Sequence, residues 1–458
     1  MVWHPTLADR SGPIYRRIVE ALATDVAEGR LQSGELLPTH RALARLLKVD
    51  LSTVTHAYRE ARARGLIEAR VGRGTFVAES LSQPRSKHPS GITFDLSMNM
   101  PPQPLGADLE GRITRGLNAL ARSPGLSSYL SYRDPGGILE EREAAAEWLR
   151  PRLSTADASR LVICPGTQSV LPMLLTGLMT SGDTVLADML TYPGMKAAAA
   201  HAGVRLVGVE GDKSGMLPDA LERAIGRHKP KAVYLIPTIH NPTAITIPLV
   251  RRRSLVEVLR KSNLTLIEDD AYGLLEPEAI PMANLAPELT YLAASVSKCM
   301  APGLRVSFLL TPTSQAADSV IETLRAFVQM TPPLTLGIVV KWLRDGSADE
   351  IVAAIRAEAA GRQKLAAQIL SKHRYHARPN GHHIWLPLPD RWTSLALVAN
   401  AQQRGLAIVG SETFLVGGKA PNAVRLALGA ATSRHELGSA LGLLLTSLDA
   451  PARANQIV

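Results

Sequence analysis

The chain has 458 residues, of which 46% are hydrophobic. This length exceeds what one hydrophobic core usually supports, so we expect a small unit and a large one. Apolar stretches break well before the roughly 18 residues that a membrane helix needs, and the N-terminus lacks the apolar segment of a secretory signal. We therefore expect a cytoplasmic protein. Its two cysteines, Cys164 and Cys299, are too few for a disulfide framework and should be small core residues.

The positive charge is concentrated near the N-terminus. The formal net charge is +10, and residues 1–90 hold 14 Lys and Arg against 9 Asp and Glu, so a fifth of the chain carries half of the excess. A basic unit of this size suits a polyanionic partner such as DNA.

Residues 1–79 have the pattern of a winged helix. Helical spacing over residues 15–28, 41–47 and 52–64 precedes two strand-like pieces, 67–70 and 75–78, hinged at Gly72 and Gly74. Residues 80–92 are rich in Ser, Pro and charge, which predicts an extended linker.

The helix predicted at 52–64 has the composition of a recognition helix. A turn over residues 48–51 precedes Ser52, whose hydroxyl is predicted to cap the helix. The residues expected to face the core are Val54, Ala57, Tyr58 and Ala61. Those expected to face base edges in the major groove of double-stranded DNA are Ser52, Thr53, Thr55, His56 and Arg59. Arg41, Arg70 and Arg73 are expected to contact phosphates or an adjacent groove.

Residues 93–450 are predicted to form an α/β domain. Apolar strand candidates at 161–164, 184–188, 204–209, 232–237, 265–269 and 290–294 alternate with helical stretches, which indicates a mostly parallel sheet covered on both faces. The large part, about 93–345, ends within a helical region that includes 316–329 and 350–371. A small α+β part, about 346–450, has strands near 383–386, 406–409 and 423–427.

Polar residues at the ends of these strands suit pyridoxal 5′-phosphate. Lys298, in the pattern S-x-S-K, can form a Schiff base with an aldehyde if burial and positive charge, here from Arg305, deprotonate it. Asp269 ends a predicted strand and can face the pyridine nitrogen. Tyr272 and Asn241 can donate to the phenolic oxygen of the ring. The glycine turn before Thr167 opens a helix that can bind phosphate.

Two resemblances follow from these motifs. The motifs PIY, G-x-L-x-x-G, LPTHRALA and GRGTFV, within residues 12–77, resemble GntR-family regulators, although Leu51 replaces an arginine common there. The glycine turn, Tyr-Pro-Gly, Asn-Pro, Asp-x-x-Tyr and Ser-x-x-Lys-x6-Arg, within residues 94–445, resemble fold-type I aminotransferases. Ala244 replaces their usual glycine and His240 precedes the asparagine. The combination resembles the MocR group of regulators.

The aminotransferase resemblance also implies roles for individual residues. The residues implied on the phosphate are Thr167, Gln168, Ser295 and Arg305. The resemblance further implies that Tyr192 stacks on the ring, that Arg425 binds a substrate or effector carboxylate, and that Tyr132 reaches the phosphate of a partner subunit in a homodimer. His382 and His383 are adjacent, and neighbouring side chains on a strand point opposite ways, so no metal site is expected.

Three functions are compatible with this pattern. The first is a regulator that senses an amine or amino acid by exchange at Lys298 and so changes operator affinity. The second is a working aminotransferase with a DNA-binding appendage, since the sequence between Asp269 and Gly273 matches ordinary aminotransferases. The third is a regulator that senses pyridoxal phosphate itself.

Overall fold

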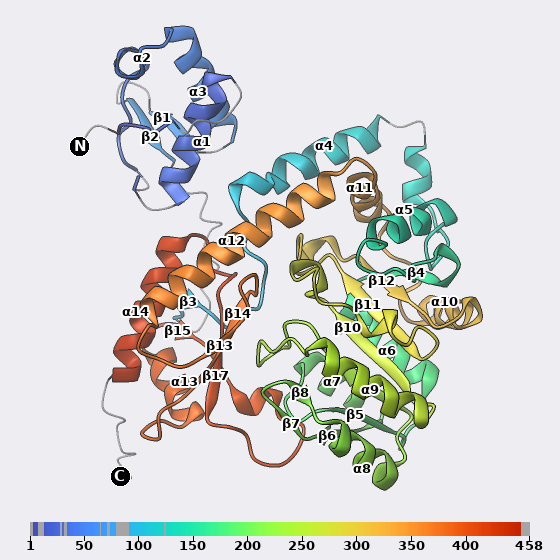
Figure 1. The fold of residues 1–458 in the computed structure, drawn as a ribbon. Coiled ribbons are helices and arrows are strands. Elements are labelled where there is room, and N and C mark those ends of the chain that lie inside the picture. The colour runs from blue at the N-terminus through green and yellow to red at the C-terminus, as the bar shows by residue number, and fades with distance from the viewer. Residues whose placement is uncertain are drawn as a thin grey trace.

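The computed structural model describes residues 3–7, 13–27, 30–31, 34–64, 66–70, 74–78, 91–122 and 125–449. Figure 1 shows a small N-terminal unit and a large unit that contains the rest of the chain. Gly72, Arg73 and most of the predicted linker lie outside the described residues, and so does the side chain of Arg70.

The N-terminal unit contains three helices and a β-hairpin, as predicted. Its elements are α1 (Ile14–Ala27), α2 (His40–Leu47), α3 (Leu51–Ala63), β1 (Ile67–Arg70) and β2 (Gly74–Val77), and the two strands are antiparallel. The four predicted inward residues of α3 are all buried: Val54, Ala57, Tyr58 and Ala61. They pack in one core with Ile18, Val19 and Leu22 of α1.

The predicted helix cap at Ser52 is wrong. Lys48 ends α2 in the left-handed conformation with φ 52°, and Asp50 is extended, so α3 already begins at Leu51. Asp50 is therefore the N-cap residue, and Ser52 is an exposed residue of the first helical turn. The sharp turn predicted at this place is present, but the chain enters the helix one residue earlier than expected.

A seven-stranded mixed sheet forms the centre of the large unit. Its strands are β4 (Leu161–Cys164), β5 (Thr184–Asp188), β6 (Arg205–Val209), β9 (Ala232–Leu235), β10 (Thr265–Asp270), β11 (Thr290–Ser295) and β12 (Ser307–Leu310). Their order is β4-β12-β11-β10-β9-β5-β6. Strand β12 is antiparallel to both neighbours, and the other pairs are parallel. The predicted α/β class is thus confirmed, while β12 was not predicted.

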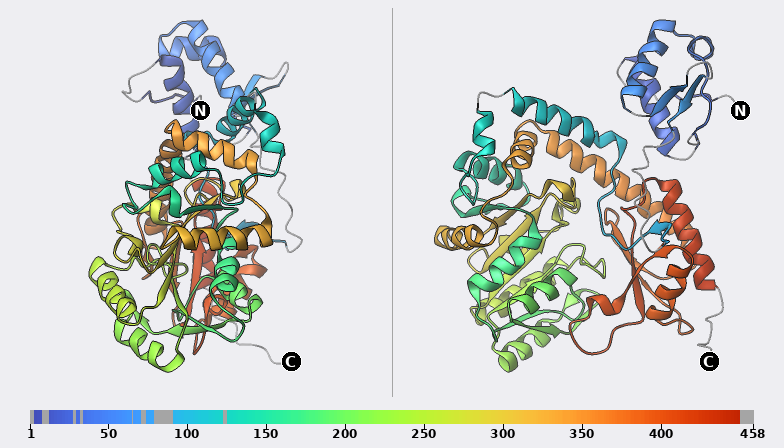
Figure 2. Two further views of the ribbon diagram at one scale, coloured as in Figure 1. Left: turned by 90° about the vertical axis from the view of Figure 1, so that its right-hand side faces the viewer. Right: turned by 180° about the vertical axis from the view of Figure 1, so that it is seen from behind.

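Both faces of this sheet are buried by helices. Alternate residues of β9 point to opposite sides: Ala232 and Tyr234 join the larger core, while Val233 and Leu235 join a second core. The larger core includes residues of α6 (Thr167–Leu178), α7 (Pro193–His201) and α10 (Ser314–Val328), and the second includes α8 (Pro218–His228) and α9 (Leu249–Lys261). Figures 1 and 2 show these helices on either side of the sheet. Cys164 and Cys299 are both buried and free, as predicted.

The remaining helices of the large part pack beside one another. They are α4 (Leu109–Ala121), α5 (Leu139–Leu149), α11 (Pro333–Arg344) and α12 (Ser347–Ile369). Helix α12 continues into the small C-terminal part, where its last turns join that core. Within the described residues, no helix combines the length and the apolar character that crossing a membrane requires.

The small C-terminal part has its own four-stranded sheet. Its order is β13 (His376–Ala377), β14 (His383–Pro387), β17 (Ala423–Ala427) and β16 (Val409–Gly410). Helices α13 (Ser394–Gln403) and α14 (Arg434–Asp449) contribute to its core. The single strand expected at 406–409 is divided, because β15 (Leu406–Ala407) pairs with β3 (Phe94–Asp95) and only β16 joins the sheet.

Candidate functional site

The predicted cofactor residues lie at the carboxyl ends of β9, β10 and β11, opposite β17 of the small part. In open α/β sheets, ligands bind outside the carboxyl ends of the parallel strands. Asn241, Asp269 and Lys298 each follow or end one of these strands, although they are far apart in sequence. The fold therefore brings the three motifs to one edge of the sheet.

Lys298 is half-buried just after the end of β11. Its Nζ donates a hydrogen bond to the carbonyl oxygen of Asn99 at 2.5 Å. Burial lowers the pKa of Lys298 to about 8, and the positive charge of Arg425 lowers it further, while Asp269 opposes the change. The sequence suggested that Arg305 supplies the positive charge that helps to deprotonate the lysine. In the structure, this charge comes from Arg425. Tertiary structure alone places Arg425 there, because it lies on a strand of the other sheet.

Asp269 is the last residue but one of β10, and only 4% of its surface is exposed. The hydroxyl of Tyr234 donates to its Oδ2 at 2.7 Å, and the amide of Ala271 donates to its Oδ1 at 3.3 Å. Burial raises the pKa of Asp269 to about 6, and these hydrogen bonds oppose the rise. The carboxylate therefore remains mostly ionised at neutral pH and can face a cationic ring nitrogen.

Asn241 and Arg425 are joined by a buried hydrogen bond. Nη1 of Arg425 donates to Oδ1 of Asn241 at 2.9 Å, and Nη2 donates to the carbonyl of Ser97. Because this bond occupies the amide oxygen, the amide nitrogen of Asn241 is the end that can donate to a ligand. Arg425 also lies over the ring of Phe414, with Cζ 5.1 Å from the ring centre. Its buried Nε has no hydrogen-bond partner among the described residues.

The phenol of Tyr272 is oriented by Asn99, which the sequence analysis did not identify. Nδ2 of Asn99 donates to the Tyr272 hydroxyl at 2.8 Å and lies 3.1 Å from Nδ1 of His383. The same asparagine accepts the Lys298 hydrogen bond through its backbone. Asn99 lies in irregular chain after β3, where no periodicity or motif signals a role.

Gly166, Thr167 and Arg305 form a cradle at the N-terminus of α6. Gly166 has φ +89°, and a Cβ on it would lie 2.6 Å from Nη2 of Arg305. Nη2 of Arg305 donates to the carbonyl of Pro165 at 2.9 Å. The Thr167 hydroxyl is buried without a hydrogen-bond partner among the described residues. An unsatisfied hydroxyl beside a guanidinium and a helix N-terminus suits a phosphate group.

Two more predicted residues border this cradle. The hydroxyl of Tyr192 donates to Oε1 of Gln168 at 2.9 Å, which connects the ring expected to stack on the cofactor with the start of α6. The hydroxyl of Ser295 accepts from the amide of Ser297 at 3.1 Å and bonds to its hydroxyl at 3.0 Å. Tyr132 is 83% exposed in the single chain.

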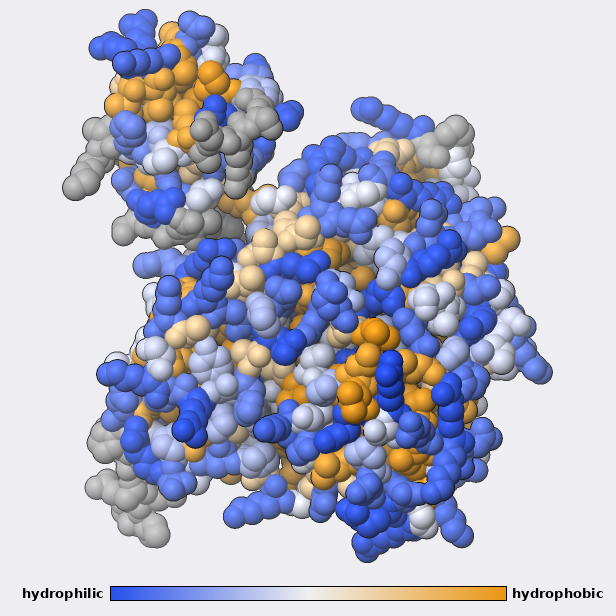
Figure 3. Space-filling model, in the orientation of Figure 1, coloured by the Kyte–Doolittle hydropathy of each residue, from blue (hydrophilic) through white to orange (hydrophobic). Residues whose placement is uncertain are grey.

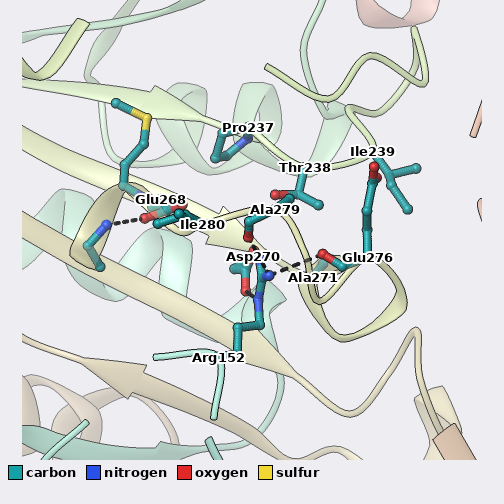
Figure 4. Close-up of polar contacts among 12 residues, drawn as sticks. Arg152, Pro237, Thr238, Ile239, Glu268, Asp270, Ala271, Glu276, Ala279 and Ile280 are labelled. Atoms are coloured by element: carbon teal, nitrogen blue, oxygen red, sulfur yellow. Dashed lines mark hydrogen bonds and ion pairs between the residues drawn. The ribbon is translucent and has the colours of Figure 1, made fainter. Parts of the chain in front are cut away.

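A buried ion pair supports the end of β10, next to Asp269. Nε and Nη2 of Arg152 donate to the two oxygens of Asp270 at 2.9 and 2.7 Å, and Nη1 donates to the carbonyls of Glu276 and Ala279 (Figure 4). Glu268, on the same strand, accepts from the amides of Met282 and Ala283. These bonds fix the turn that presents Asp269 and Tyr272.

The turn after Asn241 explains one departure from the aminotransferase pattern. Ala244 has φ +57°, in the left-handed region where a side chain costs about 1–2 kcal/mol and glycine does not. The usual glycine at this position is thus conformationally favoured, and this chain keeps the same turn with alanine. His240, just before the asparagine, accepts with its backbone oxygen from Nε2 of His383 at 3.0 Å.

His382 and His383 have partners within the site. Nε2 of His382 lies 2.7 Å from the carbonyl of Lys298, and burial lowers its pKa to about 4. Burial also lowers the pKa of His383 well below its usual value. Both imidazoles are therefore neutral at physiological pH and act as hydrogen-bonding groups around the lysine.

Taken as a donor set, these residues fit pyridoxal 5′-phosphate. A buried amine of lowered pKa, an ionised carboxylate and an unsatisfied hydroxyl beside an arginine match the aldehyde, the ring nitrogen and the phosphate of that molecule. When bound, the cofactor supplies an electrophilic aldehyde and an electron-accepting ring.

Six of the predicted DNA-contacting residues have side chains that the structure describes. Arg41, Ser52, Thr55 and Arg59 are exposed, and Thr53 and His56 are half-buried. The Thr55 hydroxyl donates to the Leu51 carbonyl at 2.8 Å, and the His56 ring stacks on Tyr15 with centres 4.1 Å apart. Leu51 is 45% exposed at the start of the helix. Figure 3 shows hydrophobic surface on this unit beside polar residues.

Two family models match the chain. Residues 95–444 match the aminotransferase class I and II family, and residues 14–77 match the bacterial regulatory proteins of the gntR family. The second match assigns DNA binding to the N-terminal unit.

Relatives of both kinds match as well. The uncharacterized HTH-type transcriptional regulator YdeF of Bacillus subtilis is 28% identical over 98% of this chain and 97% of its own length. The vitamin B6 salvage pathway transcriptional repressor PtsJ of Salmonella typhimurium is 28% identical over 82% of this chain and 86% of its own. The 2-aminoadipate transaminase of Thermus thermophilus is 28% identical over 69% of this chain and 82% of its own.

A solved structure shares the fold of the large unit. LysN, the alpha-aminoadipate aminotransferase of Thermus thermophilus, has a TM-score of 0.71 at 24% identity and covers 85% of this chain and 98% of its own. Together with the lysine, carboxylate and phosphate groups described above, the family match implies pyridoxal phosphate as the cofactor. The chain belongs to the aminotransferase class I and II family and carries an N-terminal DNA-binding domain of the gntR family.

Proposed function

We propose that this protein is a pyridoxal phosphate-dependent transcription regulator of the MocR type, which senses an amine or amino acid. The observation that carries the proposal is the presence, on one chain, of an exposed recognition helix and a complete site around Lys298. A relative named as an HTH-type transcriptional regulator aligns over nearly its whole length. We assign residues 1–79 to DNA binding, 80–92 to the linker and 93–450 to the sensor, and we expect the protein in the cytoplasm.

The chain's own residues would hold the cofactor as follows. Lys298 would hold the aldehyde end, Asp269 would pair with the ring nitrogen, and Asn241 and Tyr272 would donate to the ring oxygen. Tyr192 would cover the ring. The residues that would hold the phosphate are Thr167, Gln168, Ser295 and Arg305. The amine of an effector would bind next to Lys298, where the aldehyde of the bound cofactor would supply the electrophile.

Arg425 would bind the carboxylate of an amino-acid effector. Two of its five N–H groups are used by Asn241 and Ser97, which leaves Nε–H and one hydrogen on each terminal nitrogen. Because β17 belongs to the small part, an effector on Arg425 would connect the two parts of the large unit. If the effector contacts both parts in only one of their relative positions, its binding favours that position.

The active form would be a homodimer that presents two DNA-binding units to two half-sites. Tyr132 supports this proposal, because its ring is 83% exposed in the single chain although the family resemblance implies a cofactor contact. On each unit, the residues that would contact phosphates or an adjacent groove are Arg41, Arg70 and Arg73. Those that would face base edges are Ser52, Thr53, Thr55, His56 and Arg59.

The experiment is footprinting of the DNA upstream of the gene that encodes this chain, with purified protein, pyridoxal phosphate and candidate amino acids. We expect a protected region with two half-sites whose affinity changes when the effective amino acid is added. Lys298→Ala should bind the same region without responding to the amino acid. If the wild-type protein responds to pyridoxal phosphate with no amine present, it senses the vitamin. If neither ligand changes binding, the sensor function is refuted.

A second candidate function is amino-group transfer. It is favoured by the completeness of the lysine, aspartate, tyrosine and arginine set, and by the relative named 2-aminoadipate transaminase. Sustained exchange between an amino acid and a keto acid, followed over many turnovers, would support this function. A single stoichiometric spectral change that then stops would favour the sensor.

A further inference from the structure

A second hollow lies beside the cofactor site, at the carboxyl ends of β5, β6 and β9. The volume within it that a water-sized molecule can occupy is about 120 Å³. Apolar side chains of Met189, Val209, Ile236 and Ile245 line most of it, and the polar lining includes Asp188 and His240. Mostly apolar walls with a few polar groups are typical of small-molecule sites.

Within the part of the chain that the structure describes, the carboxylate of Asp188 pairs with no lysine or arginine. Its side chain is only 15% exposed. Its basic neighbour there is His240, whose Nε2 lies 3.5 Å from Oδ2. The other carboxylate at the hollow, Asp212, is already paired with Arg251 at 2.9 Å.

His240 does not supply the missing charge. Its Nδ1 lies 2.7 Å from the hydroxyl oxygen of Thr243, and its Nε2 lies 3.5 Å from Oδ2 of Asp188. Burial lowers the pKa of His240 to about 4, which makes the imidazole neutral at physiological pH. Burial raises the pKa of Asp188 to about 7, as expected for a carboxylate that lacks a positive neighbour.

We propose that this hollow is an accessory binding site for a compact aliphatic ammonium compound. The ammonium group would pair with the Asp188 carboxylate beside the neutral His240 ring, and the alkyl part would replace water against the apolar walls. A neutral molecule of the same shape would leave the half-buried carboxylate unpaired, so the site should discriminate strongly by charge.

The site shares one turn with the cofactor residues. His240 contributes its ring to the hollow, its backbone oxygen accepts from His383, and the next residue is Asn241, which is bonded to Arg425. A ligand that moves the His240 ring would therefore act on groups that surround the cofactor.

The test uses isothermal titration of the full-length protein with N,N-dimethylbutylamine. This tertiary amine cannot condense with an aldehyde, so its binding is independent of the cofactor. We expect the amine to bind at least tenfold more tightly than 4-methylpentan-1-ol, a neutral compound of similar shape. Asp188→Asn should weaken the amine at least tenfold, whereas Asp318→Asn, the same change at an exposed position on α10, should not.

Two more variants keep the outcome decisive. Ile245→Trp should fill the hollow and abolish binding even if Asp188→Asn folds poorly. Lys298→Ala should still bind the amine in preference to the alcohol, so failure of the sensor proposal would not affect this result. Equal affinity for amine and alcohol, or unchanged amine binding in both hollow variants, would overturn the accessory site.

Discussion

The side chains of Arg425 and Asn241 form a hydrogen bond of 2.9 Å that joins the small sheet to the turn after β9. The bond spans 184 residues of sequence and crosses from one part of the large unit to the other. It fixes which end of the Asn241 amide faces the site, and it places the guanidinium where its charge acts on Lys298. A ligand that competes for Arg425 would alter both effects together.

Lys298→Ala should abolish the visible absorbance that pyridoxal phosphate acquires when a protein lysine holds it. The reason is that Lys298 is half-buried, with a pKa lowered to about 8, near the ionised Asp269. Absorbance spectra of purified protein after cofactor addition check this, with Lys341→Ala, an exposed lysine paired with Asp345, as the matched control. A visible band that persists in Lys298→Ala would mean that another lysine holds the cofactor.

The rate of cofactor capture should rise with pH and level off near pH 9. Only the neutral amine reacts, and with a pKa of about 8 roughly a tenth of Lys298 is neutral at pH 7. Arg425→Leu removes a charge that lowers this pKa, so the profile should shift to higher pH. Arg305→Gln should weaken binding without shifting the profile. Stopped-flow absorbance between pH 6 and pH 10 measures both, and an unshifted Arg425→Leu profile would refute the assigned cause.

Gly166→Ala should weaken cofactor binding at least tenfold, or about 1.4 kcal/mol. The added Cβ would lie 2.6 Å from Nη2 of Arg305 and would displace that side chain from the cradle. Gly182→Ala is a matched control, because Gly182 has a similar φ of +92° with nothing within 4 Å of an added Cβ. Equilibrium dialysis with pyridoxal phosphate compares them. Equal weakening in both variants would point to backbone strain and not to Arg305.

Arg152→Met should lower the free energy of unfolding of the large unit by about 3–5 kcal/mol, because it leaves the buried Asp270 carboxylate unpaired. Both side chains are at most 4% exposed. Urea denaturation monitored by circular dichroism measures the loss. Adding Asp270→Leu should recover much of it, since the double variant no longer buries an uncompensated charge. Failure to recover would indicate that the bonds of Arg152 to the Glu276 and Ala279 carbonyls dominate.

Arg41→Ala should weaken operator binding and reduce its salt dependence by about one unit of slope, as expected for the loss of one phosphate contact. Arg41 is exposed at the start of α2, beside the recognition helix. Fluorescence anisotropy at several salt concentrations gives the slope. Arg325→Ala, an exposed arginine on α10, removes the same charge elsewhere and should change nothing. If Arg41→Ala also leaves the slope unchanged, the proposed orientation on DNA is wrong.

Local sequence patterns were enough to predict several strands and the main motifs of the candidate site. Short apolar segments located β4, β5 and β17 with their observed bounds, because a strand buried on both faces needs mostly continuous apolar sequence. The motifs around Lys298, Asp269 and Asn241 were visible because each follows such a strand. The boundary of α3 was missed by one residue, since Lys48 in the left-handed conformation is not signalled by its residue type.

Tertiary structure alone decided which groups meet. Asn99 lies in irregular chain and touches Lys298 and Tyr272 only because β3 pairs with β15 of the small part. The sequence pointed to Arg305 as the charge that lowers the pKa of Lys298, whereas the structure shows Arg425 in this role. Sequence alone could not show this, because the packing of the two sheets sets the distance between Arg425 and Lys298. Residue types and spacing specify which chemistry is possible, whereas burial and long-range contacts set the charge state of each group.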